Sequence, residues 1–380
     1  MTSLKYTAEK VNSHKQFKAL DGLRGIAALI VVLSHTSNVD YFFFPYFNFS
    51  GIGKSGVFLF FILSSFLLTL PLLTLGKDIF SKQQISYYWS RRFFRIYPLY
   101  FLYLLLALLS SVLINNIFGP KTWAIPFQLS FMEFGQHIFL QSGKSVTWSI
   151  AVEFKYYFIL PFIALLLSAV LHNNLVNCLS FLLFSITGLL LFQNQTWGST
   201  DVLPYLPVFL FGALLAVIQY QLKTSAFRVN AHSSRHLLNV TAYICLLILI
   251  VMIPAVYSVL FKPVEYNFFA QSFLLYSCLW SLIIFSLVNG GRSLLSDFLS
   301  SRIPCFLGKI SFSVYLIHPI FIDMMRHFKI ITPFNAWFVL LATIGVSYLA
   351  FRLIEKPGME LSITFSERYF YKNKSIKDLT

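Results

Sequence analysis

Ten long apolar segments recur along this 380-residue chain, and they constrain its fold more than any other feature. A helix needs about 20 apolar residues to cross the hydrocarbon core of a bilayer. These segments are continuously apolar, without the alternation that marks a membrane β-strand. We therefore expect an all-α polytopic membrane protein with about ten transmembrane helices. The segments cover residues 21–37, 56–75, 93–117, 148–171, 175–193, 202–222, 237–260, 267–289, 310–328 and 334–354.

The composition supports a lipid environment. Hydrophobic residues make up 57% of the chain and charged residues only 11%, whereas an average soluble domain has about 25% charged residues. The formal net charge of +15 would suggest a nucleic-acid partner in a soluble protein. Here the basic residues lie between apolar segments, so membrane topology and anionic lipids explain them. We expect the bilayer, and no nucleic acid, as a partner.

The distribution of basic residues predicts the orientation. If both termini are cytoplasmic, 22 Lys and Arg lie on the cytoplasmic side and six on the other, with Lys155 inside a span. We expect a cytoplasmic segment over 1–20, a transmembrane domain over 21–357 and a basic cytoplasmic tail over 358–380. The long outer loop, 118–147, is rich in aromatic residues and is either an interfacial amphipathic helix or a surface loop.

Ionisable residues inside the first span are the first candidates for function, because lipid disfavours them. Arg24 and His35 lie eleven positions apart, so they share a helix face, separated by about 16 Å along the axis. Arg24 lies at the cytoplasmic end and His35 toward the outer half. The same residues also fit a simpler interpretation, with Arg24 as a topology anchor and His35 at the outer interface.

A second cluster begins the third span. Arg91, Arg92 and Arg95 bring several guanidinium groups to one helix end. Such a group suits a phosphate-rich ligand. The alternative is an anchor that binds lipid headgroups.

A third cluster enters the fourth span from outside. Trp148 and Ser149 are followed by Glu153, and Ser149 and Glu153 share a face. A buried carboxylate needs a partner, and His35 is the nearest one by depth. Lys155 is the alternative partner, although it can instead extend toward the outer surface. A purely structural ion pair is a further interpretation.

A fourth cluster lies in the ninth span, where Ser311, Tyr315 and His318 form one polar stripe. They either line a cavity or join helices by hydrogen bonds. No cysteine, histidine or carboxylate cluster has the spacing of metal ligands, so we expect no metal.

Together these clusters resemble the acyltransferase 3 family, membrane O-acyltransferases that modify bacterial cell-surface glycans. The resemblance extends from about residue 20 to residue 357. One departure is visible, because the second-span motif usually has Ser-Gly where this chain has Ser64-Ser65. The residues that carry the resemblance are Arg24 with His35, the segment Phe60 to Leu67, the segment Arg91 to Pro98, Trp148 to Glu153, Ser311 to Pro319, and Glu355-Lys356-Pro357.

The resemblance implies an acyl-CoA-dependent transferase of the bacterial inner membrane. The co-substrate is acyl-CoA, with acetyl or another short acyl group, and no bound cofactor is expected. The acceptor is a hydroxyl of a carbohydrate or lipid-linked glycan of the cell envelope.

On this view each cluster has a role. CoA phosphates bind Arg91, Arg92 and Arg95, with help from Arg24. His35 is the general base, oriented by Glu153 directly or through water. Candidates for contact with the substrate or oxyanion are Ser149, Trp148, Tyr315 and His318. A covalent acyl-histidine relay is a variant of this mechanism, and a transporter or flippase of a glycan or lipid-linked intermediate is the competing class.

Overall fold

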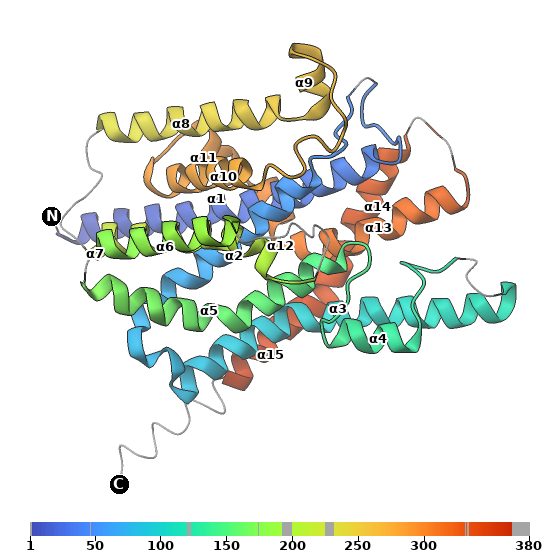
Figure 1. Cartoon of the computed structure of the whole chain (residues 1–380), viewed down its shortest axis with the longest axis horizontal. Coiled ribbons are helices and arrows are strands. Elements are labelled where there is room, and N and C mark those ends of the chain that lie inside the picture. Colours follow the sequence, from blue (N-terminus) through green and yellow to red (C-terminus); the bar gives the residue numbers. More distant parts are fainter. Residues whose placement is uncertain are drawn as a thin grey trace, which may run out of the picture.

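The computed structural model describes residues 2–45, 47–119, 123–173, 175–191, 200–224, 232–330, 332 and 334–366, and within these ranges it is helical, without a strand. Among the described residues, seven helices are long and apolar enough to cross a membrane, with an eighth span if the bent pair α12–α13 counts as one, and two further apolar helices are shorter. The predicted all-α polytopic fold is therefore confirmed. The helices are α1 Thr2–Ser37, α2 Gly53–Leu75, α3 Lys82–Phe118, α4 Phe131–Ile138, α5 Thr147–Asn173, α6 Leu175–Leu191, α7 Leu206–Thr224, α8 His232–Val251, α9 Pro254–Leu260, α10 Phe273–Asn289, α11 Leu294–Leu299, α12 Arg302–Lys309, α13 Ser311–His327, α14 Asn335–Ala350 and α15 Lys356–Ser366 (Figure 1).

Two predicted segments differ from the observed helices. The segment 237–260 is divided into α8 and α9 because Pro254 starts a new helix, where its missing N–H costs nothing. The segment 267–289 is helical only from Phe273. The end of segment 175–193 and most of the predicted tail lie outside the described residues, and the orientation of the termini stays a prediction.

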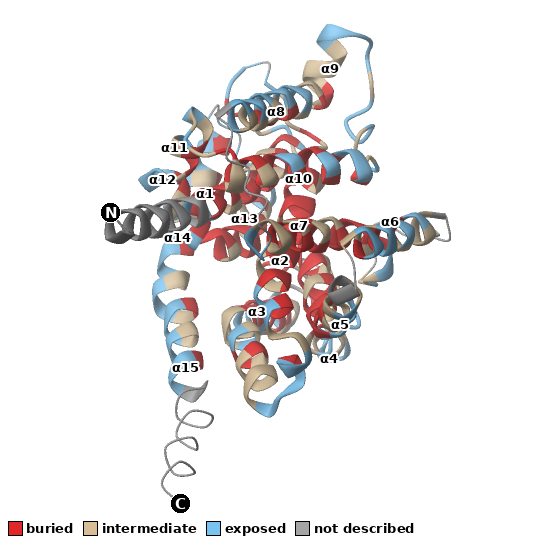
Figure 2. Ribbon diagram, turned by 90° about the vertical axis from the view of Figure 1, so that its left-hand side faces the viewer, coloured by how far each residue is buried: buried red, intermediate tan, exposed pale blue. Residues whose placement is uncertain are grey.

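The centre of the bundle is formed by α1, α2, α7, α10 and α13, where buried residues gather, whereas α6 and α8 lie at the periphery with many exposed residues (Figure 2). Large apolar side chains on these outer helices face outward, such as Phe184 and Leu237, which are 78% and 66% exposed. In a bilayer such side chains contact lipid chains.

Glycines bring α1 and α12 into close contact. A methyl group on Gly308 would lie 1.9 Å from the carbonyl oxygen of Asp21, and one on Gly25 would lie 2.6 Å from that of Pro304. Small residues allow membrane helices to approach this closely. The contact fixes the part of α1 that carries Arg24.

Ser65, which stands where the family motif usually has glycine, is accommodated without loss of packing. Ser65 is fully buried, and its hydroxyl bonds to the hydroxyl of Tyr156 at 2.8 Å. The close approach of α2 and α7 is made possible by Gly212 of the facing helix, where a methyl group would lie 2.4 Å from the carbonyl of Ile62.

Two helices are irregular near the polar centre. α12 and α13 meet at a 75° bend, so α13 starts inside the bundle at Ser311. After α14, residues Phe351–Glu355 form a π-helical turn, a feature frequently found at functional sites.

The loop between α3 and α5, which was predicted to lie on the outer side, contains α4, a short helix with a Ser130–Glu133 capping box and exposed Phe131 and Met132. The position of α4 at the membrane interface stays a prediction.

Candidate active site

Two histidines from distant parts of the chain meet at the centre of the bundle. His35, near the end of α1, and His318, in the middle of α13, are joined by a 2.8 Å hydrogen bond between His35 Nδ1 and His318 Nε2. His318 is fully buried, whereas His35 keeps part of its surface accessible. The predicted buried imidazole of α1 is thus present, with a partner that the sequence analysis did not assign to it.

The hydrogen-bond partners determine which nitrogen of each ring carries the proton. His318 Nδ1 lies 3.2 Å from the carbonyl oxygen of Val314, which can only accept, so His318 Nδ1 is the donor. In a neutral ring His318 Nε2 is then an acceptor, and His35 Nδ1 must donate to it. His35 Nε2 is left with a free lone pair, which is the state that a general base requires.

His35 Nε2 faces the start of α2. A methyl group on Gly53, the first residue of that helix, would lie 3.5 Å from this nitrogen. The first N–H groups of a helix have no intrahelical acceptor, and the helix dipole makes this end favourable for negative charge. The basic nitrogen therefore lies beside the first turn of α2, in which the N–H of Ser55 donates to the carbonyl of Ile52 at 2.9 Å.

Glu153 does not pair with His35 as predicted. Its Oε1 accepts hydrogen bonds from the hydroxyl of Ser64 and, at 2.6 Å, from that of Tyr157. The direct pairing was wrong because two hydroxyls from α2 and α5 satisfy the carboxylate locally, and a contact through water stays a prediction. The alternative partner is also excluded, since Lys155 Nζ donates to the carbonyl of Thr200 at 2.8 Å.

The four arginines divide into an exposed and an interior group. Arg91 is exposed, and its guanidinium donates to the hydroxyl of Tyr87. Arg92 lies over the ring of Tyr157, with 6.0 Å from Cζ to the ring centroid. Arg95 and Arg24 come close enough that their charges interact directly. The structure therefore brings two predicted phosphate ligands together and leaves Arg91 at the rim.

Glu355 is a site residue that the sequence analysis did not assign a role. It is 3% exposed, accepts a hydrogen bond from Ser313 and lies within electrostatic range of Arg95 and Arg24. The π-helical turn places this carboxylate in the interior. The only signal in the sequence was its position in the Glu355-Lys356-Pro357 motif.

A narrow cavity extends from Arg24, the one of these four arginines that lines it, toward α13. Its volume of about 40 Å³ has room for a few water molecules. It extends to Tyr315, whose ring centroid lies 6.1 Å from that of His318. The cavity is lined by Arg24, Val57, Phe60, Phe61, Ser149, Ile150, Glu153, Ser311, Phe312 and Tyr315.

The remaining predicted residues have different positions. The hydroxyls of Ser149 and Tyr315 lie 2.6 Å apart, and both are within hydrogen-bond distance of the carbonyl of Val146. Trp148 packs between Tyr205 and Phe61 and does not line the cavity. Among the residues that the structure describes, no three His, Cys, Asp or Glu side chains group as metal ligands.

The fold and these contacts define a polytopic membrane protein with a buried histidine pair next to a cavity that Arg24 lines. The chain belongs to the acyltransferase 3 family, because the family model described as "Acyltransferase domain" matches residues 17–352. No solved structure matches the chain significantly.

Three curated relatives are similar along most of the chain. Peptidoglycan O-acetyltransferase OatA of Listeria monocytogenes is 26% identical over 91% of this chain and 56% of its own length. Putative peptidoglycan O-acetyltransferase YrhL of Bacillus subtilis is 26% identical over 95% of this chain and 58% of its own. Acyltransferase MdmB of Streptomyces mycarofaciens is 24% identical over 79% and 77%. The chain therefore spans somewhat more than half the length of the first two relatives.

Proposed function

We propose that this chain transfers a short acyl group, such as acetyl, from cytoplasmic acyl-CoA to a hydroxyl of a cell-envelope glycan on the outer side of the bacterial inner membrane. The observation that carries the proposal is the His35–His318 pair, whose tautomers leave a basic nitrogen on His35. The cavity that Arg24 lines reaches Tyr315, whose ring centroid lies 6.1 Å from that of His318. The names of the first two relatives support a glycan acceptor.

The donor would bind at the arginine end. Arg24 and Arg92 both repel Arg95, whereas Glu355 and Glu153 attract it, so three guanidinium groups face two carboxylates and an added anion is favoured near them. Arg24 Nε is buried without a hydrogen-bond partner and is available to such an anion. CoA phosphates carry the required charge. The thioester arm would enter the narrow cavity, which must widen to admit it.

The chemical step follows from the free lone pair of His35. Nε2 removes the proton of the acceptor hydroxyl, whose oxygen forms a bond to the thioester carbon. The carbon–sulfur bond then breaks, and the proton passes from the imidazole to the leaving thiolate. The positive end of the helix dipole of α2, which begins at Gly53, stabilises the oxyanion that forms between the two steps.

The test uses proteoliposomes that contain labelled acetyl-CoA and a glycan acceptor on opposite sides. His35→Ala should abolish acyl transfer, and Arg95→Gln should weaken the use of CoA selectively, while Arg302→Gln, an exposed arginine outside the cavity, serves as the charge-matched control. Full activity of His35→Ala would refute the mechanism. Movement of the acceptor without CoA release would instead indicate a transporter.

A further inference from the structure

The last turns of α1 carry a second polar side chain beside the imidazole of His35. Ser34 immediately precedes this histidine and is only 1% exposed. Its hydroxyl is buried and has no hydrogen-bond partner among the residues that the structure describes. A buried hydroxyl without a partner costs free energy, so the few that occur in native proteins call for an explanation.

Other hydroxyls inside the helices of this chain find a local acceptor. Thr36, two residues further along α1, donates to the carbonyl of Val32 at 3.0 Å. Ser111 of α3 donates to the carbonyl of Ala107 at 2.6 Å. Both bonds reach back four residues, which is a common arrangement for serine and threonine inside a helix. Ser34 makes no such bond, so its hydroxyl is not used by its own helix.

The hydroxyl of Ser34 instead borders the same space as the basic nitrogen of His35. A methyl group on Gly53, the first residue of α2, would lie 3.2 Å from Ser34 Oγ and 3.5 Å from His35 Nε2. Both atoms therefore contact one small region at the start of α2. In the proposed reaction the acceptor hydroxyl must lie next to Nε2, so the reacting atoms come to this region.

The two groups have complementary hydrogen-bonding capacities. Because His35 Nδ1 donates to His318, Nε2 of the neutral ring is an acceptor only. A serine hydroxyl can donate, and this one has no other acceptor to give up. Acyl transfer requires this combination, since a base must take a proton while a donor stabilises the negative charge that develops on the acyl oxygen.

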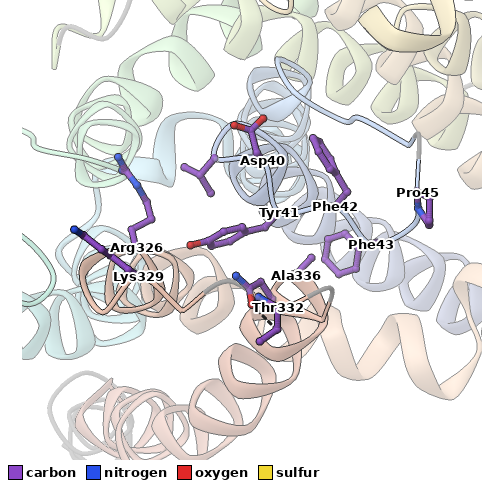
Figure 3. A pocket seen from close by; sticks show the side chains of 11 residues that line it. Asp40, Tyr41, Phe42, Phe43, Pro45, Arg326, Lys329, Thr332 and Ala336 are labelled. Atoms are coloured by element: carbon purple, nitrogen blue, oxygen red, sulfur yellow. Dashed lines mark hydrogen bonds between the residues drawn. The ribbon is translucent and has the colours of Figure 1, made fainter.

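The backbone that carries Ser34 is held in place by the turn that follows α1. The N–H of Asn38 donates to the carbonyl of Ser34 at 2.9 Å, and the N–H of Tyr41 donates to that of Thr36 at 3.0 Å. This turn leads directly into the wall of a pocket of about 580 Å³, where Figure 3 shows Asp40 and Tyr41. A side chain on a fixed backbone is better suited to catalysis than one on a loose loop.

We propose that Ser34 is a further catalytic residue, whose hydroxyl donates a hydrogen bond to the oxyanion that forms on the acyl group during transfer. The hydroxyl keeps its proton and forms no bond to the acyl carbon, while His35 takes the proton of the acceptor and passes it to the leaving thiolate. This inference rests on the proposed function. It adds a side-chain donor to the helix dipole of α2.

The test measures transfer of labelled acetyl groups from acetyl-CoA in membranes that retain their envelope glycans. Ser34→Ala should lower kcat by about 100-fold, which is typical when one oxyanion donor is removed. KM for acetyl-CoA should stay unchanged, because the bond forms only in the transition state. The control is Ser347→Ala on α14, since Ser347 is also fully buried without a partner and does not line the central cavity; it should keep the kcat of the wild type.

The melting temperature separates a catalytic role from a structural one. Ser34→Ala removes an unsatisfied hydroxyl, so its melting temperature should equal or exceed that of the wild type, as in Ser347→Ala. A clear fall would indicate a structural bond and overturn the inference. A kcat within about fivefold of the wild type would also overturn it, as would a labelled acetyl group found covalently on Ser34.

A second variant separates loss of the donor from loss of volume. Ser34→Cys fills the same space, but a thiol is a weak donor, so kcat should still fall by at least about tenfold. Recovery of the wild-type kcat in Ser34→Cys would show that volume alone matters, and would overturn the inference.

Failure of the proposed function gives a different result. His35→Ala is measured in the same membranes. Full activity of His35→Ala, or no transfer by the wild type, would refute the acyltransferase mechanism itself. An inactive His35→Ala together with an unimpaired Ser34→Ala would refute the assignment of Ser34 alone.

Discussion

Replacement of His318 tests the hydrogen-bond relay directly. In the structure His318 accepts the Nδ1 proton of His35 and donates its own to Val314. His318→Ala removes the acceptor and leaves a buried N–H unsatisfied at a cost of about 1–3 kcal/mol. The ring of His35 avoids this cost by changing tautomer, which protonates Nε2 and removes the base. Because about 1.4 kcal/mol corresponds to a factor of ten, we expect kcat to fall by about 10- to 100-fold.

The matched variant is His318→Gln, whose side-chain carbonyl can still accept from His35 Nδ1. It should retain kcat within about fivefold of the wild type, while KM for acyl-CoA stays unchanged in both variants, because His318 does not contact the donor phosphates. The assay follows transfer of labelled acetyl groups in membranes with equal amounts of folded protein, checked by melting temperature. Equal losses in the Ala and Gln variants, or an Ala variant within twofold of the wild type, would refute the relay.

Three further results are expected. Gly53→Ala places a methyl group 3.5 Å from the basic nitrogen and 3.2 Å from Ser34 Oγ, so activity should fall more than tenfold with only a small loss of melting temperature as Ser34 shifts; unchanged activity would mean that the substrate does not occupy this space. Gly308→Ala forces a methyl group against the backbone of Asp21 and should destabilise the protein by about 1–3 kcal/mol in reversible unfolding, and an unchanged stability would contradict the close helix contact. The hydrogen bond from Lys144 lowers the pKa of Glu133 from 4.5 to about 2, so its stabilisation of α4 is complete above pH 4.5 and is lost as the pH falls through 2. Hydrogen exchange of α4 should therefore be slower in the wild type than in Glu133→Gln at pH 6, with the difference shrinking toward pH 2, and no difference at pH 6 would contradict this role.

Helical periodicity was sufficient to predict the parts of the site that lie on one regular helix. Arg24 and His35 were placed on one face of the first span from their spacing alone, and the structure has Arg24 in the cavity and His35 bonded to His318, whose ring lies next to Tyr315 of the cavity wall. The polar stripe of α13 was predicted in the same way, with Tyr315 lining the cavity and His318 next to it.

Contacts between helices were harder to predict, because depth in the membrane does not determine which helices are neighbours. His35 and Glu153 lie at similar depths, but the carboxylate meets Ser64 and the imidazole meets His318 instead. Glu355 was missed for another reason, since regular 3.6-residue periodicity does not describe a π-helical turn. The 75° bend before α13 likewise has no simple signature in an apolar sequence.

The small volume of the central cavity has a consequence for the membrane potential, because it limits the leakage of ions. A membrane that maintains a potential loses about 2.3 kcal/mol for each elementary charge that leaks through per 100 mV. A passage of about 40 Å³, bordered by Phe60, Phe61 and Phe312, holds too little water to hydrate a moving ion. Under the proposed function, the neutral acyl group would therefore cross a bilayer that stays electrically insulating between reactions.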